Sequence, residues 1–361
     1  MSADDPDALR WCDPYHSPNR LKARAVLTLL LISVALTAAV AARTKPIDPD
    51  TAWDSLFYRS MAFNLITLTR PDLDVPPVGS QLWAAYRIPL AQRMANPETY
   101  FLAIRNGLRR QPPYAYRVVT PLLARALFSL TGSIDSAFYI ITFASLAGAA
   151  FFLALTVYSV AGSIAAAATA ILLFALNPTT GRFNFYVYIL TDPLAFFLTA
   201  IAIFALVRRR RGLFFLVCLV GVFNKETMVP LLMCYPLSEL LVEHRVRGRS
   251  VIAAGSIVAA WFAFTLLLPV PVHTYSLLRE FRGLGYIGTV AAAAVATFGV
   301  LILGWWRPVI SPLLVSLLPF AAGNVAAAWF VGDTTRALAQ VLPVLVVAIL
   351  WLWPLDRLGR M

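Results

Sequence analysis

Long stretches without charged side chains constrain this chain more than any other feature. Five of them contain no Asp, Glu, Lys or Arg and cover residues 25–42, 136–181, 251–278, 283–306 and 308–332. A helix needs about 20 mainly apolar residues to cross the hydrocarbon core of a bilayer. A soluble domain with 60% hydrophobic and only 13% charged residues would aggregate. The sequence therefore predicts an all-α polytopic membrane protein.

Clusters of arginine and lysine between the apolar stretches orient the chain, because short loops rich in these residues stay on the cytoplasmic side. Placing every cluster inside gives about ten transmembrane helices with both termini cytoplasmic. Membrane topology and contact with anionic lipid also explain the net charge of +12 better than nucleic acid does. The clusters are Arg20, Lys22 and Arg24; Arg208 to Arg211; Arg245, Arg247 and Arg249; Arg307; and Arg357 with Arg360.

One transmembrane domain, residues 24–354, is expected between a cytoplasmic segment 1–23 and a tail 355–361. A cleaved signal peptide at 25–42 is the alternative for the first span, but the polar segment before it is long for one. The expected spans are 24–42, 135–157, 161–177, 187–207, 212–226, 228–243, 250–269, 286–305, 308–328 and 337–354.

A long first extracytoplasmic loop, residues 43–134, separates the first two spans. Its basic residues do not contradict this placement, because long segments translocate largely regardless of charge. Within it, 53–68 and 113–130 carry apolar residues at helical spacing with Trp, Tyr and Arg interleaved. Such segments are typical of helices that lie on the membrane surface.

Under this topology the unusual ionisable residues gather at the outer face. A charged side chain at mid-helix costs about 2.5 to 3.5 kcal/mol on insertion scales, so its presence there suggests a functional site. The loop supplies Asp48, Asp50, Asp54 and Arg117, and the outer span ends supply Asp192, Asn224, Lys225, Glu226, His273, Asp333 and Arg336.

Lys225 and Glu226 stand out because the 13 or so residues between Arg211 and Asn224 reach only about 20 Å, less than a core of about 30 Å. The pair is expected below the outer surface, where Lys225 could hold an anionic head group. A mutual ion pair that closes a short hairpin is the structural alternative.

Structural explanations also exist for the other candidates. Thr191 or Asp192, before Pro193, could cap a helix. Asp333 and Arg336 are three residues apart and could form a local ion pair. Asp48 and Asp50 flank Pro49, as in turns, and Asp54 could be a helix cap or a carboxylate held over the membrane. The sequence indicates no role for His273, which stands alone in a loop. It also indicates none for the three cysteines, which lack paired spacing: Cys12, Cys218 and Cys234.

Four groups of residues resemble the GT-C superfamily of integral-membrane glycosyltransferases, particularly the bacterial relatives of mannosyltransferases. There is no P-loop, dinucleotide fingerprint, HExxH motif, paired CxxC or Gly-x-Ser-x-Gly elbow to suggest another enzyme class. The groups are Trp53-Asp54 with Tyr58; Tyr116-Arg-Val-Val-Thr-Pro121; Asn177-Pro178 with Thr191-Asp192-Pro193; and Asn224-Lys225-Glu226.

The resemblance implies sugar transfer from a polyprenyl-phosphate carrier to a glycan, lipid or protein acceptor at the extracytoplasmic face, usually with inversion. It implies Asp54 as general base, with Asp50 or Asp48 as the runner-up. Lys225, Arg336 and Arg117 are the implied phosphate ligands, with Asp192, Glu226 and Asp333 in the same site. No cofactor is required, although a divalent metal is permitted, and relatives with two adjacent acids differ from this loop.

Two other functions remain open. A transporter or flippase for a lipid-linked or anionic solute would use the same charges in alternating access, although no inverted repeat is visible. A non-catalytic scaffold would tolerate replacement of Asp54 or Lys225. Arginine is much more frequent than lysine, as in proteins from GC-rich bacterial genomes. We therefore expect a multi-pass protein of a bacterial inner membrane.

Overall fold

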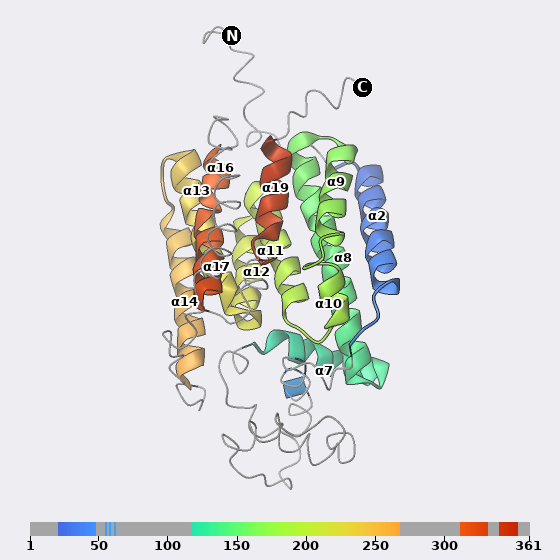
Figure 1. Ribbon diagram of the computed structural model, residues 1–361. Coiled ribbons are helices and arrows are strands. Elements are labelled where there is room, and N and C mark those ends of the chain that lie inside the picture. The colour runs from blue at the N-terminus through green and yellow to red at the C-terminus, as the bar shows by residue number, and fades with distance from the viewer. Residues whose placement is uncertain are drawn as a thin grey trace.

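The computed structural model describes residues 21–47, 55, 58, 61–62, 117–267, 311–330 and 339–352. Every regular element in these ranges is a helix, and most of the helices run side by side as a bundle (Figure 1). They are α2 (Ala23–Ala42), α7 (Val119–Thr131), α8 (Ile134–Ala161), α9 (Ile164–Ala175), α10 (Arg182–Tyr186), α11 (Asp192–Val207), α12 (Arg211–Asn224), η3 (Glu226–Met233), α13 (Cys234–Glu243), α14 (Gly248–Leu267), α16 (Ser311–Ser316), α17 (Leu318–Phe330) and α19 (Leu342–Leu352).

Three of the described helices are long and apolar enough to cross a membrane: Ala23–Ala42, Ile134–Ala161 and Gly248–Leu266. Large apolar side chains are exposed on two of these helices. They include Leu27 and Leu31 on α2, and Ile252 and Leu266 on α14. Lipid tails, unlike water, solvate such surfaces without cost. The prediction of an all-helical membrane protein is therefore supported at this level.

Helix α8 is the centre of the bundle and packs against α2, α7, α9 and α11. It begins after Ser133, whose hydroxyl accepts a hydrogen bond from the Ser136 amide at 3.3 Å, and it ends at Gly162. Gly162 has a φ of +68°, a left-handed conformation that glycine adopts without a steric penalty. Ser163 then caps α9, so the chain turns close to the boundary between the predicted spans 135–157 and 161–177.

The predicted span 228–243 is not one continuous α-helix. It is divided into the 3-10 helix η3 and the α-helix α13. Pro230 lies inside η3, where it lacks an amide donor and its ring obstructs the α-helical hydrogen-bond pattern. Gly323 of α17 packs directly on it, since a Cβ at Gly323 would approach Pro230 Cγ to 2.3 Å.

The other predicted spans overlap the observed helices to different extents. Helices cover parts of 24–42, 135–157, 161–177, 187–207, 212–226, 250–269, 308–328 and 337–354. The span 286–305 lies outside the described residues, as does most of 53–68, in which Ser55, Tyr58, Met61 and Ala62 are helical.

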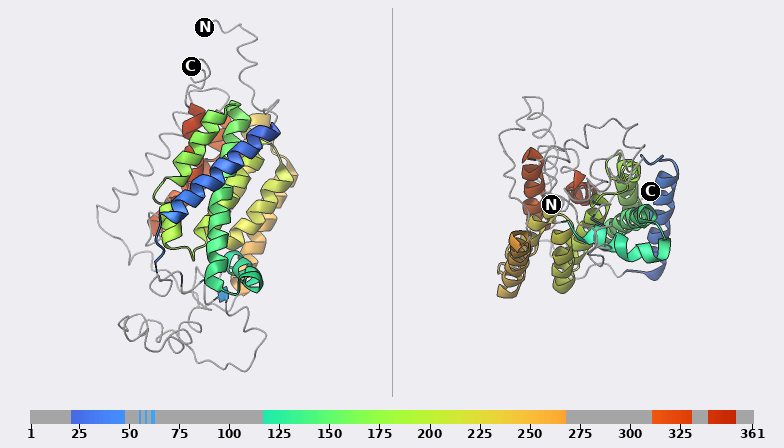
Figure 2. Two further views of the ribbon diagram at one scale, coloured as in Figure 1. Left: turned by 90° about the vertical axis from the view of Figure 1, so that its right-hand side faces the viewer. Right: turned by 90° about the horizontal axis from the view of Figure 1, so that it is seen from below.

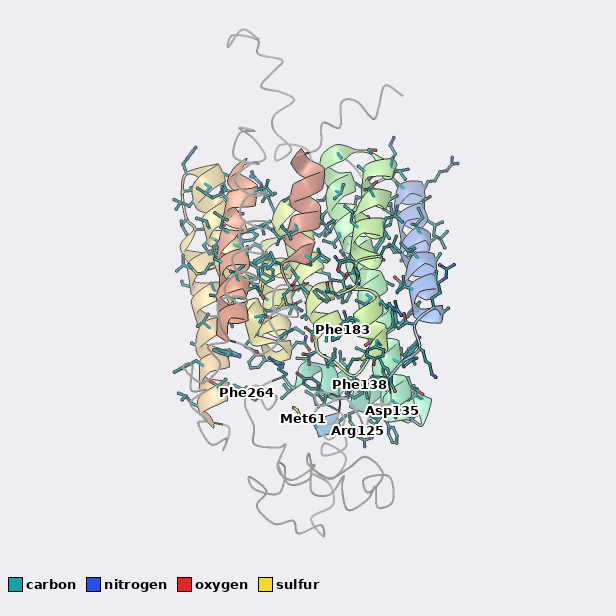
Figure 3. All side chains as sticks on the ribbon, in the orientation of Figure 1. Met61, Arg125, Asp135, Phe138, Phe183 and Phe264 are labelled. Carbon is teal, nitrogen blue, oxygen red and sulfur yellow. The ribbon has the colours of Figure 1, made fainter. Side chains whose placement is uncertain are left out.

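Helix α7, within the segment predicted to lie on the membrane surface, runs across one end of the bundle, almost perpendicular to its neighbours (Figures 1 and 2). An apolar cluster joins it to the start of α8 and to residues 183–190; its members include Tyr58, Ala124, Phe138 and Ile189. Figure 3 shows Met61, Arg125, Asp135 and Phe138 together at this end.

The opposite end of the bundle carries the basic loops. Arg208–Arg211 connects α11 to α12, and the loop after α13 folds back onto Glu239. The carboxylate of Glu239 is 3% exposed and accepts hydrogen bonds from the Ser250 hydroxyl at 2.9 Å and the Arg247 amide at 3.1 Å. Arg247 also donates to Glu243 at 2.8 Å. Acidic side chains of α13 thus bind the basic loop that follows it.

Candidate functional site

The Asn224-Lys225-Glu226 sequence interrupts a helix. Helix α12 ends at Asn224, Lys225 is extended with φ −159° and ψ 125°, and η3 begins at Glu226. The backbone stays hydrogen-bonded, because the Lys225 amide donates to the Gly221 carbonyl at 2.8 Å and the Met228 amide donates to the Lys225 carbonyl at 3.0 Å. At 1.5 Å per residue, the 14 residues of α12 span about 21 Å, less than a bilayer core. The extended residue lets three consecutive side chains reach different partners.

Glu226 is held by Arg117, 109 residues earlier in the sequence. Arg117 Nε donates to Glu226 Oε2 at 2.8 Å, and Nη2 donates to Oε1, so the contact is bidentate. Arg117 Nη1 also donates to the Tyr58 hydroxyl at 2.8 Å. Burial by itself would lower the pKa of Arg117, but its interactions with Glu226 and Tyr58 raise that pKa well above its ordinary value. Arg117 is 7% exposed and links Tyr58 to η3.

Lys225 pairs with Asp192, the first residue of α11. Lys225 Nζ donates to Asp192 Oδ1, and Gln340 Nε2 donates to the same oxygen at 3.0 Å. The Lys225 and Asp192 side chains are 5% and 4% exposed. The ion pair between Lys225 and Glu226 that the sequence allowed is therefore wrong, because each of them pairs with another residue. Thr191 occupies the cap position of α11 without a side-chain cap bond, and Asp192 contributes its carboxylate to the pair with Lys225.

A chain of neutral hydrogen bonds joins helices α7, α11 and α12. The Thr120 hydroxyl of α7 donates to Asn224 Oδ1 at 2.6 Å, and Asn224 Nδ2 donates to the Thr191 carbonyl at 3.0 Å. The Thr191 hydroxyl lies 3.4 Å from the Tyr58 hydroxyl and completes the connection to Arg117. All four side chains are fully buried. This network fixes the start of α11 against the end of α12 and the start of α7.

Three buried polar atoms beside this network have no hydrogen-bond partner among the described residues: Gln340 Oε1, Asn324 Oδ1 and Thr227 Oγ1. Asn324 belongs to α17, and its Nδ2 donates to the Thr227 carbonyl at 3.2 Å. A buried acceptor left unsatisfied costs roughly 1 to 3 kcal/mol. Thr227 and Asn324 lie at η3 and Gln340 lies beside Asp192, and their oxygens offer sites at which a ligand hydroxyl or a water can donate.

The described part of the site is close to electrically neutral. Two cations, Arg117 and Lys225, each contact one carboxylate, on Glu226 and Asp192. Paired charges cost less to bury than isolated ones, and pairing also fixes each cationic group in one position. Cations fixed in advance stabilise developing negative charge without reorganising during a reaction. Glu226 is the most accessible of the four, with its side chain 28% exposed.

The candidate residues divide between the described ranges and the rest of the chain. Arg117, Asp192, Lys225 and Glu226 come together at one end of the bundle. The remaining candidates, Asp48, Asp50, Asp54, His273, Asp333 and Arg336, lie outside the described residues. No group of three or more His, Cys, Asp or Glu with metal-binding geometry occurs in the described part of the chain.

Sequence reasoning missed Gln340 and Asn324, and it named Thr120 only within the motif at 116–121. Each is a single polar residue in a mostly apolar segment, which is the signal that could have identified it. The sequence alone does not show which of many such Thr, Asn and Gln side chains face the same interior.

No family model matches this chain, and neither a curated protein nor a solved structure matches it.

Proposed function

We propose that this protein is an integral-membrane glycosyltransferase that moves a sugar from a polyprenyl-phosphate carrier to a glycan, lipid or protein acceptor. One observation carries the proposal. The four sequence groups that resemble GT-C enzymes are far apart in the chain, yet Tyr58, Arg117, Asp192 and the 224–226 segment belong to one hydrogen-bonded cluster. Residues that serve only to cap local helices would have no reason to converge in this way.

Loss of the phosphate leaving group is the step that the cluster suits best. Breaking the glycosidic bond transfers an electron pair to the carrier phosphate, whose growing charge needs cations in a water-poor pocket. Arg117 and Lys225 fill this role in the proposal, with Arg336 as a third cation, while Glu226 and Asp192 orient the first two. Asp333 remains part of the same proposed phosphate site.

The attacking hydroxyl needs a carboxylate within hydrogen-bond reach, on the face of the sugar opposite the leaving phosphate. Asp54 takes this role, with Asp50 and Asp48 as alternatives. Four residues can span at most roughly 14 Å, so Tyr58, which is bonded to Arg117, tethers Asp54 to the neighbourhood of the cluster. Transfer with inversion follows from a single displacement of this kind, with the base taking the hydroxyl proton. A divalent metal is compatible with the scheme but is not needed for it.

The proposal includes a topology of ten spans with both termini in the cytoplasm of a bacterium and the site at the outer face. It is supported by the distribution of charge along α11, which begins at the candidate-site residue Asp192 and is followed by Arg208–Arg211. These 16 residues span about 24 Å, so the arginines and the site lie at opposite ends (Figure 1). Short arginine-rich loops remain cytoplasmic.

A transporter or flippase is the second candidate, and the interrupted helix favours it. Broken helices with buried charges are also how transporters build midplane binding sites. The two functions differ in outcome: a transporter moves an intact solute across the membrane, whereas the enzyme forms a new glycosidic bond.

A transfer assay distinguishes them. Purified wild-type protein in lipid nanodiscs receives radiolabelled polyprenyl-phosphate sugars one at a time, with a membrane extract as the acceptor pool. We expect one donor to be consumed and its label to appear in a new product. The same donors are then incorporated into the bilayer of proteoliposomes. Movement of intact donor across the bilayer, without any product in either format, would reject the glycosyltransferase in favour of a flippase.

A further inference from the structure

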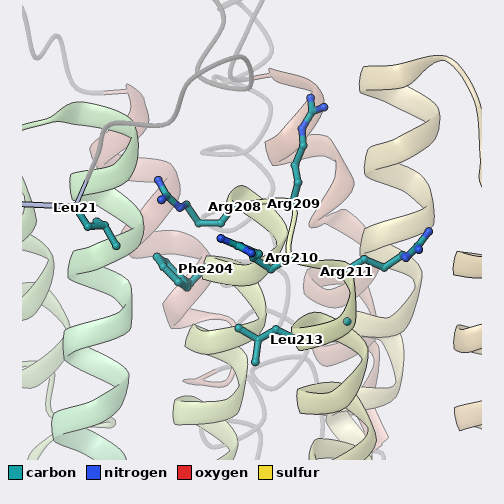
Figure 4. A pocket seen from close by; sticks show the side chains of 8 residues that line it. Leu21, Phe204, Arg208, Arg209, Arg210, Arg211 and Leu213 are labelled. Atoms are coloured by element: carbon teal, nitrogen blue, oxygen red, sulfur yellow. The ribbon is translucent and has the colours of Figure 1, made fainter.

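A second polar feature lies at the other end of the bundle, away from the proposed catalytic cluster. A cavity of about 700 Å³ is lined by the four consecutive arginines 208–211, together with Leu21, Phe204 and Leu213 (Figure 4). Among the described residues, no acidic side chain lines it. Its walls therefore combine a concentrated positive charge with apolar side chains from three different parts of the chain.

The turn between α11 and α12 fixes how the arginines are displayed. Arg209 has a φ of +53°, and the Arg210 amide donates to the Ala205 carbonyl at 2.7 Å, so the backbone reverses direction within a few residues. As a result, successive side chains diverge. Figure 4 shows Arg208 and Arg210 pointing to the side on which Leu21 lies, while Arg211 points the other way.

Arg209 has different surroundings. Arg209 lies 3.6 Å from Glu243 of α13, an ion pair that holds the turn against the neighbouring helix. Arg208 and Arg210 are the cations whose side chains point to the Leu21 side of the cavity (Figure 4). Helix α12 begins beside them, at Arg211.

The apolar part of the lining distinguishes the ligand. Phe204 and Leu213 lie below the arginines in Figure 4, towards the middle of the bundle, and Leu21 lies two residues before helix α2, which has exposed apolar side chains. A small free anion makes no use of such walls. A molecule with a phosphate at the membrane surface and acyl chains below it matches both parts, and basic pockets at helix ends bind lipid head groups in this way.

We propose that this cavity binds an anionic phospholipid, with its phosphate between Arg208 and Arg210 and its acyl chains against Phe204 and Leu213. The site is separate from the proposed sugar-transfer site, so its occupancy does not depend on that activity. Bound lipid would hold the segment before α2 to the α11–α12 hairpin.

Native mass spectrometry of the detergent-purified full-length protein tests the site. Dioleoyl phosphatidylglycerol is titrated against wild type, Arg208→Gln/Arg210→Gln and the control Arg245→Gln/Arg249→Gln, which removes the same charge from the loop and helix after α13. At the free energy expected per arginine near a charged head group, the first double variant should bind roughly 25-fold more weakly. The control should bind as wild type does. Equal weakening of both double variants, or of neither, would overturn the proposal.

Two further probes separate the sources of phosphate. Dioleoyl phosphatidylcholine has the same chains without a net charge and should bind far more weakly than phosphatidylglycerol. Inorganic phosphate at millimolar concentration should not displace the bound lipid; if it does so as readily as phosphatidylglycerol binds, the cavity takes free anions and the lipid proposal is wrong.

A second variant keeps the test decisive if the arginine variants fail to fold. Leu213 is 38% exposed on α12, so Leu213→Glu places a negative charge in the wall without disturbing a core. Leu216→Glu is its control, because Leu216 is 59% exposed on the same helix and does not line the cavity. Phosphatidylglycerol binding should fall in the first variant alone, and equal binding by both would contradict the site.

Discussion

Replacing Lys225 by Met tests whether the cluster contains a true buried ion pair. Lys225 and Asp192 are 5% and 4% exposed, so removal of the cation leaves the carboxylate in a place where its charge is poorly solvated. Breaking a buried pair from one side costs about 3 to 5 kcal/mol. We expect Lys225→Met to lower the free energy of unfolding by an amount in this range.

A double-mutant cycle isolates the pair itself. The variants are Lys225→Met, Asp192→Asn and the double substitution, and reversible unfolding by SDS in mixed micelles gives each free energy of unfolding. Neutral hydrogen bonds between membrane helices couple by about 0.6 kcal/mol and by about 1.7 at most. A coupling energy of about 2 kcal/mol or more would therefore identify a charged pair, and the double variant should be more stable than Lys225→Met alone.

An exposed ion pair in the same protein is the matched control. Arg247 and Glu243 are 2.8 Å apart with side chains 45% and 18% exposed, and such pairs couple by about 0.3 to 0.5 kcal/mol. A cycle on this pair shows what the method reports for a weak contact. If the Lys225–Asp192 coupling does not exceed the Arg247–Glu243 coupling, the argument for a buried charged pair is refuted.

Three further substitutions test other contacts by the same unfolding measurement. Arg117→Lys keeps the charge but not the bidentate hydrogen bonds, and we expect a loss of about 1 to 3 kcal/mol; unchanged stability would contradict the bidentate geometry. Gly323→Ala forces a Cβ to 2.3 Å from Pro230 and should cost about 1 to 3 kcal/mol, whereas Gly255→Ala, with nothing within 4 Å, should cost nothing. Glu239→Gln removes a buried charge that accepts two hydrogen bonds and forms an ion pair with the Arg247 side chain, and it should also cost about 1 to 3 kcal/mol. Unchanged stability would show that these interactions do not hold the loop.

Helix positions were largely predictable because uncharged apolar runs and basic loops constrain them strongly. The break at Gly162 coincides with a glycine followed by a capping serine, which is a local signal. The division of 228–243 into η3 and α13 was also signalled, by Pro230, but hydropathy alone gives no reason to end an α-helix inside an apolar segment. Helix lengths were less predictable, since several apolar helices are shorter than a bilayer core is thick.

The sequence singled out the four described candidates, Arg117, Asp192, Lys225 and Glu226, but it did not indicate which of them pair. Burial cost identified Asp192 and Lys225 individually, because charge is expensive in an apolar segment whatever its partner. Their pairing depends on the contact between α11 and α12, and the pairing of Arg117 with Glu226 spans 109 residues. Neighbours in sequence, such as Lys225 and Glu226, were the natural guess. The extended backbone at Lys225 separates them, and no composition signal predicts this conformation.

The central claim, sugar transfer with an outer-loop base, is tested most directly by measuring donor binding and transfer on one preparation of Asp54→Asn. Asp72→Asn is the control, since it makes the same change elsewhere in the same loop. Loss of a general base lowers the rate by about 10² to 10⁴, so Asp54→Asn should bind the donor as wild type does and transfer at least about a hundredfold more slowly. Transfer at the rate of the Asp72→Asn control would contradict the account.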